Sequence, residues 1–212
     1  MIHAEFMNKL PPLLQLTNLS RTTFGPVSLD IEAGDCLGIY GPSGAGKSQL
    51  LRAIAELDPS DGDIALDGIA SHAIAPSEWR KQVGLLPPES CWWYATPHEH
   101  FVNGMPIPLE HIGFTHTILD RPVTRLSSGE KQRLALLRLL ANKPRVLLLD
   151  EPTANLDPEN VQRVERVIEA YRREHEAAVL WVSHDRQQIK RVATRLFECS
   201  QGKIQEHEMA SQ

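Results

Sequence analysis

The chain has 212 residues, of which 42% are hydrophobic and 23% are charged, and its formal net charge is −5. This length suits one domain with a substantial core, and the acidic balance argues against sequence-independent binding to DNA. The three cysteines (Cys36, Cys91 and Cys199) form no CxxC pair, which argues against a disulfide framework and favours a reducing, cytosolic setting. We see neither a signal-peptide pattern nor an apolar run of ~18 residues, so we expect any membrane span to belong to another chain.

The N-terminal region alternates apolar and polar residues in the manner of β-strands. Strands are predicted for Leu13 to Leu16 and for Val27 to Ile31, and Phe24 between them is expected to be a loop aromatic that packs on the domain. The next apolar run, Cys36 to Tyr40, is typical of a buried parallel strand.

A glycine-rich stretch, GPSGAGKS, follows this strand and fits the pattern G-x-x-x-x-G-K-[ST]. Its glycines let backbone N–H groups surround an anion, and the predicted helix after it adds unpaired N–H donors. Lys47 is placed to reach the β- and γ-phosphates of a nucleotide, and the Ser48 hydroxyl to bind Mg²⁺. The sequence therefore predicts a nucleotide-phosphate site made of Gly41, Pro42, Ser43, Gly44, Ala45, Gly46, Lys47 and Ser48.

Two more strands and a helix are predicted before residue 89. A turn precedes a short strand at Asp63 to Gly68, which ends in a second turn. Ser77 is expected to cap the N-terminus of a helix. The apolar run Val83 to Leu86 is predicted to be a strand that Pro87 and Pro88 stop.

The segment from residue 89 to about residue 125 differs in character, because four prolines interrupt it. We expect a small inserted subdomain of short helices and loops there. His98 and His100 are either metal ligands or, as we favour, solvated or hydrogen-bonded side chains, since no carboxylate or cysteine cluster shares a ligand spacing with them. Trp92 and Trp93 form either local core, the commoner case, or a contact surface, because adjacent side chains of an extended segment point to opposite faces.

The second half of the chain alternates helices with apolar strands. Helices are predicted to open at Leu126 to Arg133 and to span Pro158 to about His175 and Gln187 to Ala193, and strands to span Val146 to Leu149, Val179 to Val182 and Leu196 to Cys199. The polar tail after Gln205 is expected to fray. Such alternation calls for a mainly parallel sheet in an α/β domain.

Two strand ends carry the residues that hydrolysis of a nucleotide needs. Asp150, directly after a buried run, is placed to hold Mg²⁺ opposite the Ser48 hydroxyl, and the adjacent Glu151 to deprotonate the attacking water. His184, at the end of the next strand, is a candidate to hold that water and to stabilise charge on the γ-phosphate. Taken alone, His184 would instead be a capping or solvated histidine.

Five segments resemble, in order, those of the ATP-binding cassette (ABC) ATPases: GPSGAGKS, LSSGEKQR, VLLLDEP, ANLD and VSHD. LSSGE ahead of LLLDEP is the most specific part, and the match covers nearly the whole chain. The resemblance implies one cassette over residues 1–212, with a P-loop NTPase (RecA-like) α/β core, a small antiparallel β-subdomain and a short helical subdomain at about 89–125. It also implies two ATP molecules held between two chains paired head to tail, as a homodimer or with a second cassette.

The resemblance also implies roles for single residues. In the signature segment LSSGEKQR, Ser127 and Gly129, with Ser128 between them, would meet the γ-phosphate of ATP bound to the partner chain. Asp157 would communicate across the dimer. Glu151 would be the catalytic base and His184 the switch histidine, so that the hydrolytic set comprises Lys47, Asp150, Glu151 and His184.

The chain departs from the family pattern in the nucleotide site. The family usually has Thr or Ser at the position of Gln49, where this side chain contacts the α-phosphate. The candidate residue for contact with the α-phosphate in this chain is therefore a glutamine. Ser128 replaces a usual glycine. The aromatic that stacks on adenine is not obvious, and Phe24 is the candidate.

A further departure follows the strand Val83 to Leu86. The family normally has a glutamine there that binds Mg²⁺ or water, whereas this chain has Pro88, which offers no ligand. The neighbouring Glu89 becomes the candidate oxygen ligand for the metal. The subdomain after it is shorter than usual, and in the family it docks a membrane partner.

The leading hypothesis is the ATPase subunit of a transporter, which binds and hydrolyses ATP with Mg²⁺ and powers a separate transmembrane permease from the cytoplasmic face of the membrane. No nucleic-acid partner is expected. Two alternatives stay open. One is a soluble ATP-driven clamp or regulator that acts without transport; the other is a binding module that barely hydrolyses ATP, which Gln49 and Pro88 motivate.

Overall fold

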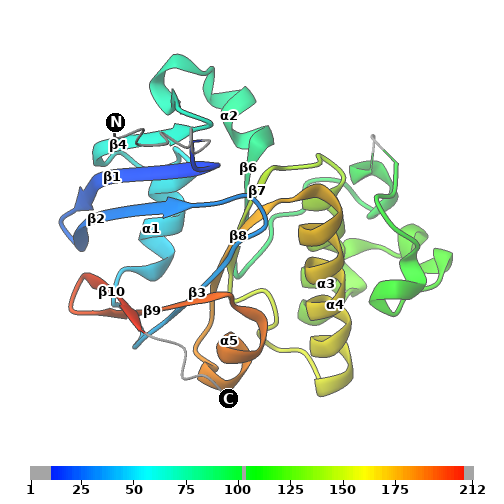
Figure 1. The fold of residues 1–212 in the computed structure, drawn as a ribbon. Coiled ribbons are helices and arrows are strands. Elements are labelled where there is room, and N and C mark those ends of the chain that lie inside the picture. Colours follow the sequence, from blue (N-terminus) through cyan, green and yellow to red (C-terminus); the bar gives the residue numbers. More distant parts are fainter. Residues whose placement is uncertain (1–10, 102–103, 208–212) are drawn as a thin grey trace, which may run out of the picture.

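The computed structural model describes residues 11–101 and 104–207, which form two β-sheets with helices packed on them (Figure 1). The smaller sheet is antiparallel, with strand order β2-β1-β4-β5, and the larger has the order β10-β9-β3-β8-β7-β6. The predicted fold class, an α/β core beside a small antiparallel sheet, is confirmed. No helix in these residues combines the length and the apolar character of a membrane span.

The smaller sheet is built around β1. Its strands are β1 (Leu14–Arg21), β2 (Phe24–Ile31), β4 (Asp61–Leu66) and β5 (Ile69–Ala70). Leu14 of β1 is in register with Ile31 on one side and Leu66 on the other, and all three are buried. Phe24 begins β2 rather than lying in a loop, because it pairs with Arg21 across a tight connection.

The larger sheet brings three loops to one edge. The strands β3 (Cys36–Tyr40), β6 (Val83–Leu86), β7 (Val146–Asp150), β8 (Ala178–Val182) and β9 (Arg195–Ser200) are parallel, and β10 (Lys203–His207) pairs antiparallel with β9. β8 lies between β3 and β7, and Val182 is in register with Ile39 and Asp150. The carboxyl ends of these three strands therefore stand side by side, at the edge where such sheets bind ligands.

Helices connect these strands. The α-helices are α1 (Lys47–Ile54), α2 (Pro76–Gln82), α3 (Ser128–Leu140), α4 (Pro158–His175) and α5 (Arg186–Val192). Short 3₁₀ turns span Ser71–Ala73, His98–His100, Leu109–Ile112, His116–Asp120 and Val123–Arg125. All but the first lie in the segment 89–125, where short helices are predicted.

The larger sheet is buried on both faces, as a parallel sheet requires. Val146 and Leu148 of β7 pack in a core with α1 and the smaller sheet, whereas Leu147 and Leu149 pack in a second core with α3, α4 and α5. Figure 1 shows α1 on one side of the sheet and α3 and α4 on the other. The unbroken apolar run in the sequence follows from this two-sided burial.

Two element ends differ from expectation. Ser77 is not the cap of α2: Ala75 holds the N-cap position and Pro76 follows it, since the fixed φ of proline suits the first helical position. Glu206 and His207 lie within β10 instead of a frayed tail, because this strand pairs with β9 up to His207. The residues after 207 lie outside the described ones.

Candidate functional site

The phosphate loop, residues 41–48, joins β3 to α1. Gly46 has a φ of 101°, and a Cβ there would lie 3.0 Å from the Thr23 carbonyl oxygen. A Cβ on Gly41 would lie 2.0 Å from the Cys199 carbonyl oxygen. Only glycine fits at both positions, so the loop can take the curled path that points backbone N–H groups at an anion, next to the N-terminus of α1.

Lys47, the first residue of α1, is folded back over this loop and is 6% exposed. Its Nζ donates to the carbonyl oxygens of Gly41 at 2.8 Å and Pro42 at 2.9 Å. An ammonium group has three N–H donors, so one remains for an anion in addition to these bonds. Lys47 therefore places a buried positive charge at the phosphate loop.

Asp150, the last residue of β7, faces the start of α1. Its carboxylate is 4% exposed and accepts a hydrogen bond from the Ser48 hydroxyl. Burial raises the pKa of the Asp150 carboxyl, whereas Ser48 and the Lys47 charge oppose that rise. Hydroxyl and carboxylate oxygens are the ligands that Mg²⁺ prefers, and phosphates and water commonly supply the rest, so this pair fits the ion.

Glu151 and His184 meet at the ends of the neighbouring strands β7 and β8. Glu151 Oε1 is buried and lies 3.2 Å from His184 Nε2, at an angle that makes no hydrogen bond, and no other described residue bonds to this oxygen. The Glu151 backbone has a φ of 50°, in the left-handed region that side chains rarely adopt. Burial raises the pKa of the Glu151 carboxyl, and His184 lowers it. A carboxylate in this setting suits proton transfer.

These groups line one cavity of about 300 Å³. Its walls are Ser43, Gly44, Gly46, Lys47, Ser48, Gln49, Pro88, Asp150, Glu151 and His184. A larger cavity, about 670 Å³, lies between α4 and residues 104–111 and contains no phosphate-loop residue. Chemistry rather than size therefore identifies the candidate site, in which the predicted loop, acidic strand end and histidine come together.

The start of the signature segment is not part of this cavity, as its walls among the described residues include neither Ser127 nor Gly129. Ser127 caps α3: its Oγ accepts from the Glu130 N–H at 3.2 Å, and the Glu130 carboxylate accepts from the Ser127 N–H at 2.8 Å. The Ser127 hydroxyl hydrogen remains free to donate. Ser127 and Ser128 are exposed, so this helix start can meet an anion from outside the chain.

Asp157 is also outside the cavity and caps α4. Its Oδ1 accepts from the N–H groups of Asn160 at 3.0 Å and Glu159 at 3.1 Å. Hydrogen bonds from Asn160 lower the pKa of the Asp157 carboxyl. The cap is a role that the sequence analysis did not assign, while the role across a dimer stays a prediction.

Two predicted site residues do not reach the site. Phe24 is 3% exposed and packs in the hydrophobic core, so its ring has no free face for adenine and the candidate is wrong. Glu89 is exposed and is not among the cavity walls, where Pro88 stands instead. Gln49 does line the cavity, and its amide oxygen accepts from the Thr23 hydroxyl.

The segment 89–101 holds the histidines and tryptophans. His100 is buried and accepts from the Tyr94 N–H at 3.2 Å, so it is a hydrogen-bonded histidine, as favoured above. The described residues contain no group of three His, Cys, Asp or Glu side chains suited to a metal. Trp92 packs partly against the core, whereas Trp93 is 65% exposed, yet Arg138 lies over both rings, 4.5 Å and 4.8 Å from their centroids.

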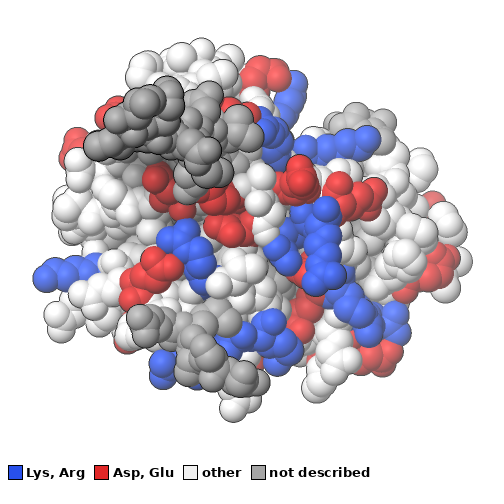
Figure 2. Space-filling view, viewed as in Figure 1, with Lys and Arg blue, Asp and Glu red and all other residues white. Residues whose placement is uncertain are grey.

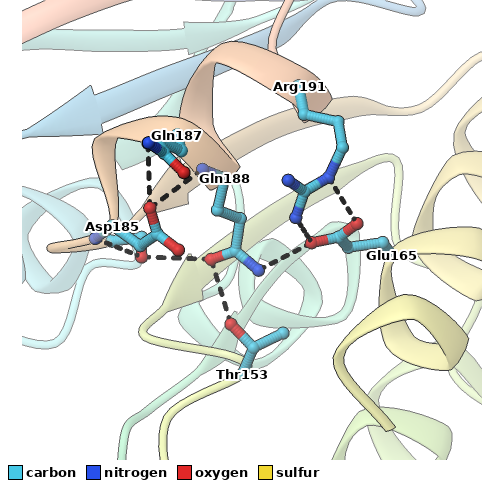
Figure 3. A network of polar contacts seen from close by, with 7 residues as sticks. Thr153, Glu165, Asp185, Gln187, Gln188 and Arg191 are labelled. Atoms are coloured by element: carbon cyan, nitrogen blue, oxygen red, sulfur yellow. Dashed lines mark hydrogen bonds and ion pairs between the residues drawn. The ribbon is translucent and has the colours of Figure 1, made fainter. Parts of the chain in front are cut away.

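The sequence analysis missed a network of polar contacts around a buried glutamine, drawn in Figure 3. Its centre is Gln188 on α5, which bonds to Thr153, Ser183 and Glu165. The one signal in the sequence is that Gln188 lies one helical turn after His184. A glutamine in a short helix usually faces solvent, so the pattern alone does not reveal a buried role.

Known proteins match the chain over most of its length. The family described as ABC transporter matches residues 24–154. The probable iron export ATP-binding protein FetA of Escherichia coli (strain K12) is 35% identical over 201 residues, which cover 86% of this chain and 89% of FetA. The tungstate uptake system ATP-binding protein TupC of Peptoclostridium acidaminophilum is 30% identical, with 91% and 97% covered. Protein STAR1 of Oryza sativa subsp. japonica is 36% identical, but the match covers 79% of this chain and only 52% of STAR1.

Solved structures share the fold. A dimeric ATP-binding cassette in a post-hydrolysis state, bound to ADP and Pi, superposes with a TM-score of 0.81 at 23% identity, covering 94% of this chain and 100% of that one. CbiO1 of Clostridium perfringens, described as part of the ABC transporter complex CbiONQ, gives a TM-score of 0.77 at 22% identity, with 92% and 87% covered. At these identities the likeness concerns the fold.

Proposed function

The chain belongs to the ABC transporter family, and from this membership we propose that it is the ATP-hydrolysing subunit of a transporter whose membrane part is a separate chain. One observation carries the proposal. Lys47, Asp150 and the Glu151–His184 pair, far apart in sequence, line a single cavity at the ends of β3, β7 and β8. These are the groups that hydrolysis of a nucleoside triphosphate needs.

Each group has one task in the hydrolysis of ATP to ADP and phosphate. The phosphate loop and the Lys47 ammonium bind the β- and γ-phosphates, and Ser48 and Asp150 hold Mg²⁺, which neutralises charge on the phosphate oxygens when bound. Glu151 takes a proton from water as the water oxygen bonds to the γ-phosphorus and the bond to the β-phosphate oxygen breaks. His184, whose Nε2 lies 3.2 Å from Glu151 Oε1, holds the attacking water and stabilises the γ-phosphate charge.

A site shared by two chains accounts for the signature segment. Ser127 is exposed at the start of α3 and Gly129 is buried there, and neither lines the cavity of its own chain. A second copy, or a second cassette, paired head to tail would bring its Ser127 segment opposite the phosphate loop. The similar cassette structure with ADP and Pi is dimeric, which supports this arrangement.

The permease is proposed to contact a groove of about 460 Å³ beside β6. Trp93 and Leu57 line it and are 65% and 45% exposed. A partner that covers such large apolar side chains removes them from water, and tryptophan often anchors interfaces. CbiO1, which shares the fold, is part of a transporter complex. The chain would then act at the cytoplasmic face of the membrane.

The charge distribution supports a protein rather than a nucleic-acid partner. Figure 2 shows basic and acidic side chains mixed over the face that carries α4. Ion pairs there join Arg163 to Glu159, and both Arg172 and Arg173 to Glu169. Charges of both signs side by side do not make the broad basic surface that phosphate backbones require on this face.

Partner capture tests the proposal. A tagged Glu151→Gln chain, expected to hold ATP without hydrolysing it, would be purified with Mg-ATP from a mild-detergent cell extract. The matched control adds Lys47→Ala, which removes the charge that binds the phosphates. We expect a protein with several membrane spans to copurify with the first variant and to be depleted with the second. Recovery of only soluble proteins or nucleic acid would overturn transport and favour an ATP-driven clamp.

Pro88 favours a second candidate function, a module that binds ATP but barely hydrolyses it. This proline forms a cavity wall where the family has a metal- or water-binding glutamine, and it offers no oxygen ligand. Steady-state hydrolysis with the captured permease present separates the two functions. A wild-type rate well above that of Glu151→Gln supports the ATPase, whereas equal rates would establish the module.

A further inference from the structure

A buried glutamine, Gln188, bonds to residues that adjoin Glu151 and His184 in the sequence, and Figure 3 draws its contacts. The Gln188 side chain is 2% exposed, and its amide makes three hydrogen bonds. Oε1 accepts from Thr153 Oγ1 at 3.0 Å and from Ser183 Oγ at 3.1 Å. Nε2 donates to Glu165 Oε1 at 2.9 Å. The partners come from the loop after β7, the end of β8 and helix α4, so one side chain joins three segments.

Two of these partners adjoin the residues assigned to hydrolysis. Thr153 lies two positions after Glu151, and Ser183 directly precedes His184. Ser183 Oγ also accepts from the Asp185 N–H at 3.1 Å, so this hydroxyl links the residue before His184 to the residue after it. Gln188 therefore links the backbone that carries Glu151 to the backbone that carries His184, whose side chains lie 3.2 Å apart.

Glu165 sets the orientation of the Gln188 amide. The Glu165 carboxylate accepts from Arg191 Nη2 at 2.6 Å and from Arg191 Nε at 3.0 Å. A carboxylate paired in this way is ionised and has no hydrogen to donate, so it must also be the acceptor in its bond with Gln188. The NH₂ end of Gln188 must face it, which leaves Oε1 for the two hydroxyl donors. A flipped amide would set oxygen against oxygen, so this buried group has one arrangement that satisfies all partners.

Resting on the proposed function, we infer that Gln188 is a positioning residue for ATP hydrolysis, which holds the loop of Glu151 against the loop of His184. It is not among the cavity walls, so it acts through its neighbours and not on ATP itself. The Glu151 N–H already donates to the Val182 carbonyl oxygen at 3.0 Å, and Gln188 adds the side-chain link beyond that bond, between Thr153 and Ser183. Without Gln188 the segments after this backbone bond can shift relative to each other. A misplacement of about 1 Å between reacting groups costs up to ~100-fold in rate.

The first test replaces Gln188 by leucine, which keeps the size of the side chain and removes all three hydrogen bonds. Its matched control is Gln187→Leu, the same change at the exposed neighbouring position. We expect Gln188→Leu to lower kcat by about 10- to 100-fold and to leave the KM for ATP within about twofold, because the phosphate loop is untouched. Gln187→Leu should leave both values unchanged.

A reciprocal exchange tests the hydrogen-bond pattern itself and guards against simple misfolding. Gln188→Glu alone sets a carboxylate against Glu165 and should lose kcat as Gln188→Leu does. Because Arg191 Nη2 donates to the same Glu165 oxygen as Gln188 does, the exchange is made in an Arg191→Leu background. There the double variant Gln188→Glu with Glu165→Gln restores a donor–acceptor pair, and the new carboxylate still accepts from Thr153 and Ser183. We expect the double variant to recover kcat to within about threefold of the Arg191→Leu chain. Failure to recover, in a variant that melts like the Arg191→Leu chain, would overturn the inference.

Hydrogen exchange without nucleotide separates this inference from the proposed function. Gln188→Leu should speed amide exchange in both 151–155 and 183–186, and Gln187→Leu should not. Unchanged exchange, or a normal kcat in Gln188→Leu, would overturn the positioning role. A wild-type protein that never hydrolyses ATP would overturn the proposed function instead, and the exchange result would still decide whether Gln188 ties the loops.

Discussion

Glu151 and Asp157 are six residues apart, yet their carboxyl pKa values are shifted in opposite directions. Burial raises the pKa of Glu151, and one of its oxygens has no hydrogen-bond donor among the described residues. Hydrogen bonds from Asn160 lower the pKa of Asp157, which is exposed. At the scale of single residues, burial thus suits the Glu151 carboxylate to the proposed role of proton acceptor, whereas hydrogen bonds keep the Asp157 carboxylate charged at its helix cap.

A first prediction concerns the base. Glu151→Gln keeps the shape of the side chain but cannot take a proton, so we expect kcat to fall by about 100- to 10,000-fold. ATP binding should change little, because Lys47 and the phosphate loop remain. Steady-state phosphate release and binding of a fluorescent nucleotide measure the two effects. Glu174→Gln, an exposed change near the end of α4, is the control, and a tenfold or smaller loss in Glu151→Gln would contradict the assignment.

At the scale of elements, single polar side chains decide where helices begin. Ser127 and Glu130 satisfy each other's backbone N–H groups at the start of α3, a reciprocal cap. Asp58 lies after α1 and links that helix to β1 through ion pairs with Arg52 and Arg21, both at 2.8 Å. The Asp58 ion pairs therefore hold α1, the helix that follows the phosphate loop, to the smaller sheet.

The cap of α3 leads to a stability prediction. Ser127→Ala removes the side-chain oxygen that accepts from the Glu130 N–H, and we expect it to lower the free energy of unfolding by about 1 kcal/mol. Ser127→Thr should keep most of the cap. Ser128→Ala, one position inside the helix, is the control and should have little effect. Urea unfolding measures the three variants, and an equal loss in Ser127→Ala and Ser128→Ala would show that the cap is not the cause.

The Asp58 ion pairs predict a dependence of stability on pH. Hydrogen bonds from Arg52 and Arg21 lower the pKa of the Asp58 carboxyl below its ordinary 3.8. Their contribution is therefore full above pH ~4 and is lost as the pH falls through the lower folded-state pKa. We expect Asp58→Asn to melt below wild type at pH 7, with the gap shrinking toward pH 2. Asp61→Asn, an exposed control, should show no such pattern, and a gap that is constant with pH would refute the ion-pair origin.

At the scale of the whole molecule, the residues that we propose to bind one ATP are divided between two surfaces. The cavity presents the phosphate loop and the Glu151–His184 pair, while the exposed start of α3 presents Ser127. One chain cannot join these surfaces in the arrangement that the structure describes. Two chains paired head to tail bring the phosphate loop of each chain opposite the α3 start of the other and so form two complete sites. The dimer is for this reason part of the proposed function.

Mixing defective chains tests this division. Lys47→Ala removes the phosphate-binding charge, and Ser127→Arg blocks the signature segment, so each variant alone should be inactive. In an equal mixture, about half of the dimers are mixed and hold one intact site, so roughly a quarter of wild-type activity should return. The double variant mixed with Lys47→Ala contains no intact site and should stay inactive. No recovery in the first mixture would argue against the shared site.

The sequence by itself determined the parts that depend on local pattern. The apolar run at Val146 predicts a buried strand, and the glycines and Lys47 predict a phosphate loop. Both predictions succeed because neighbouring residues largely determine the backbone conformation and the burial of a strand. Since parallel strands end at one edge of the sheet, the motifs alone also predict that Asp150, Glu151 and His184 lie near that loop.

Only the tertiary structure decided which side chains meet across the chain. Phe24 looks like a free aromatic, but two sheets and α1 close over it; Glu89 looks like a ligand, but Pro88 faces the cavity. Gln188 looks like a surface residue, yet α5 packs it against α4 and two loops. The segments that bury a side chain or supply its hydrogen-bond partners are distant in sequence. A local pattern therefore does not indicate which of them will cover a given residue.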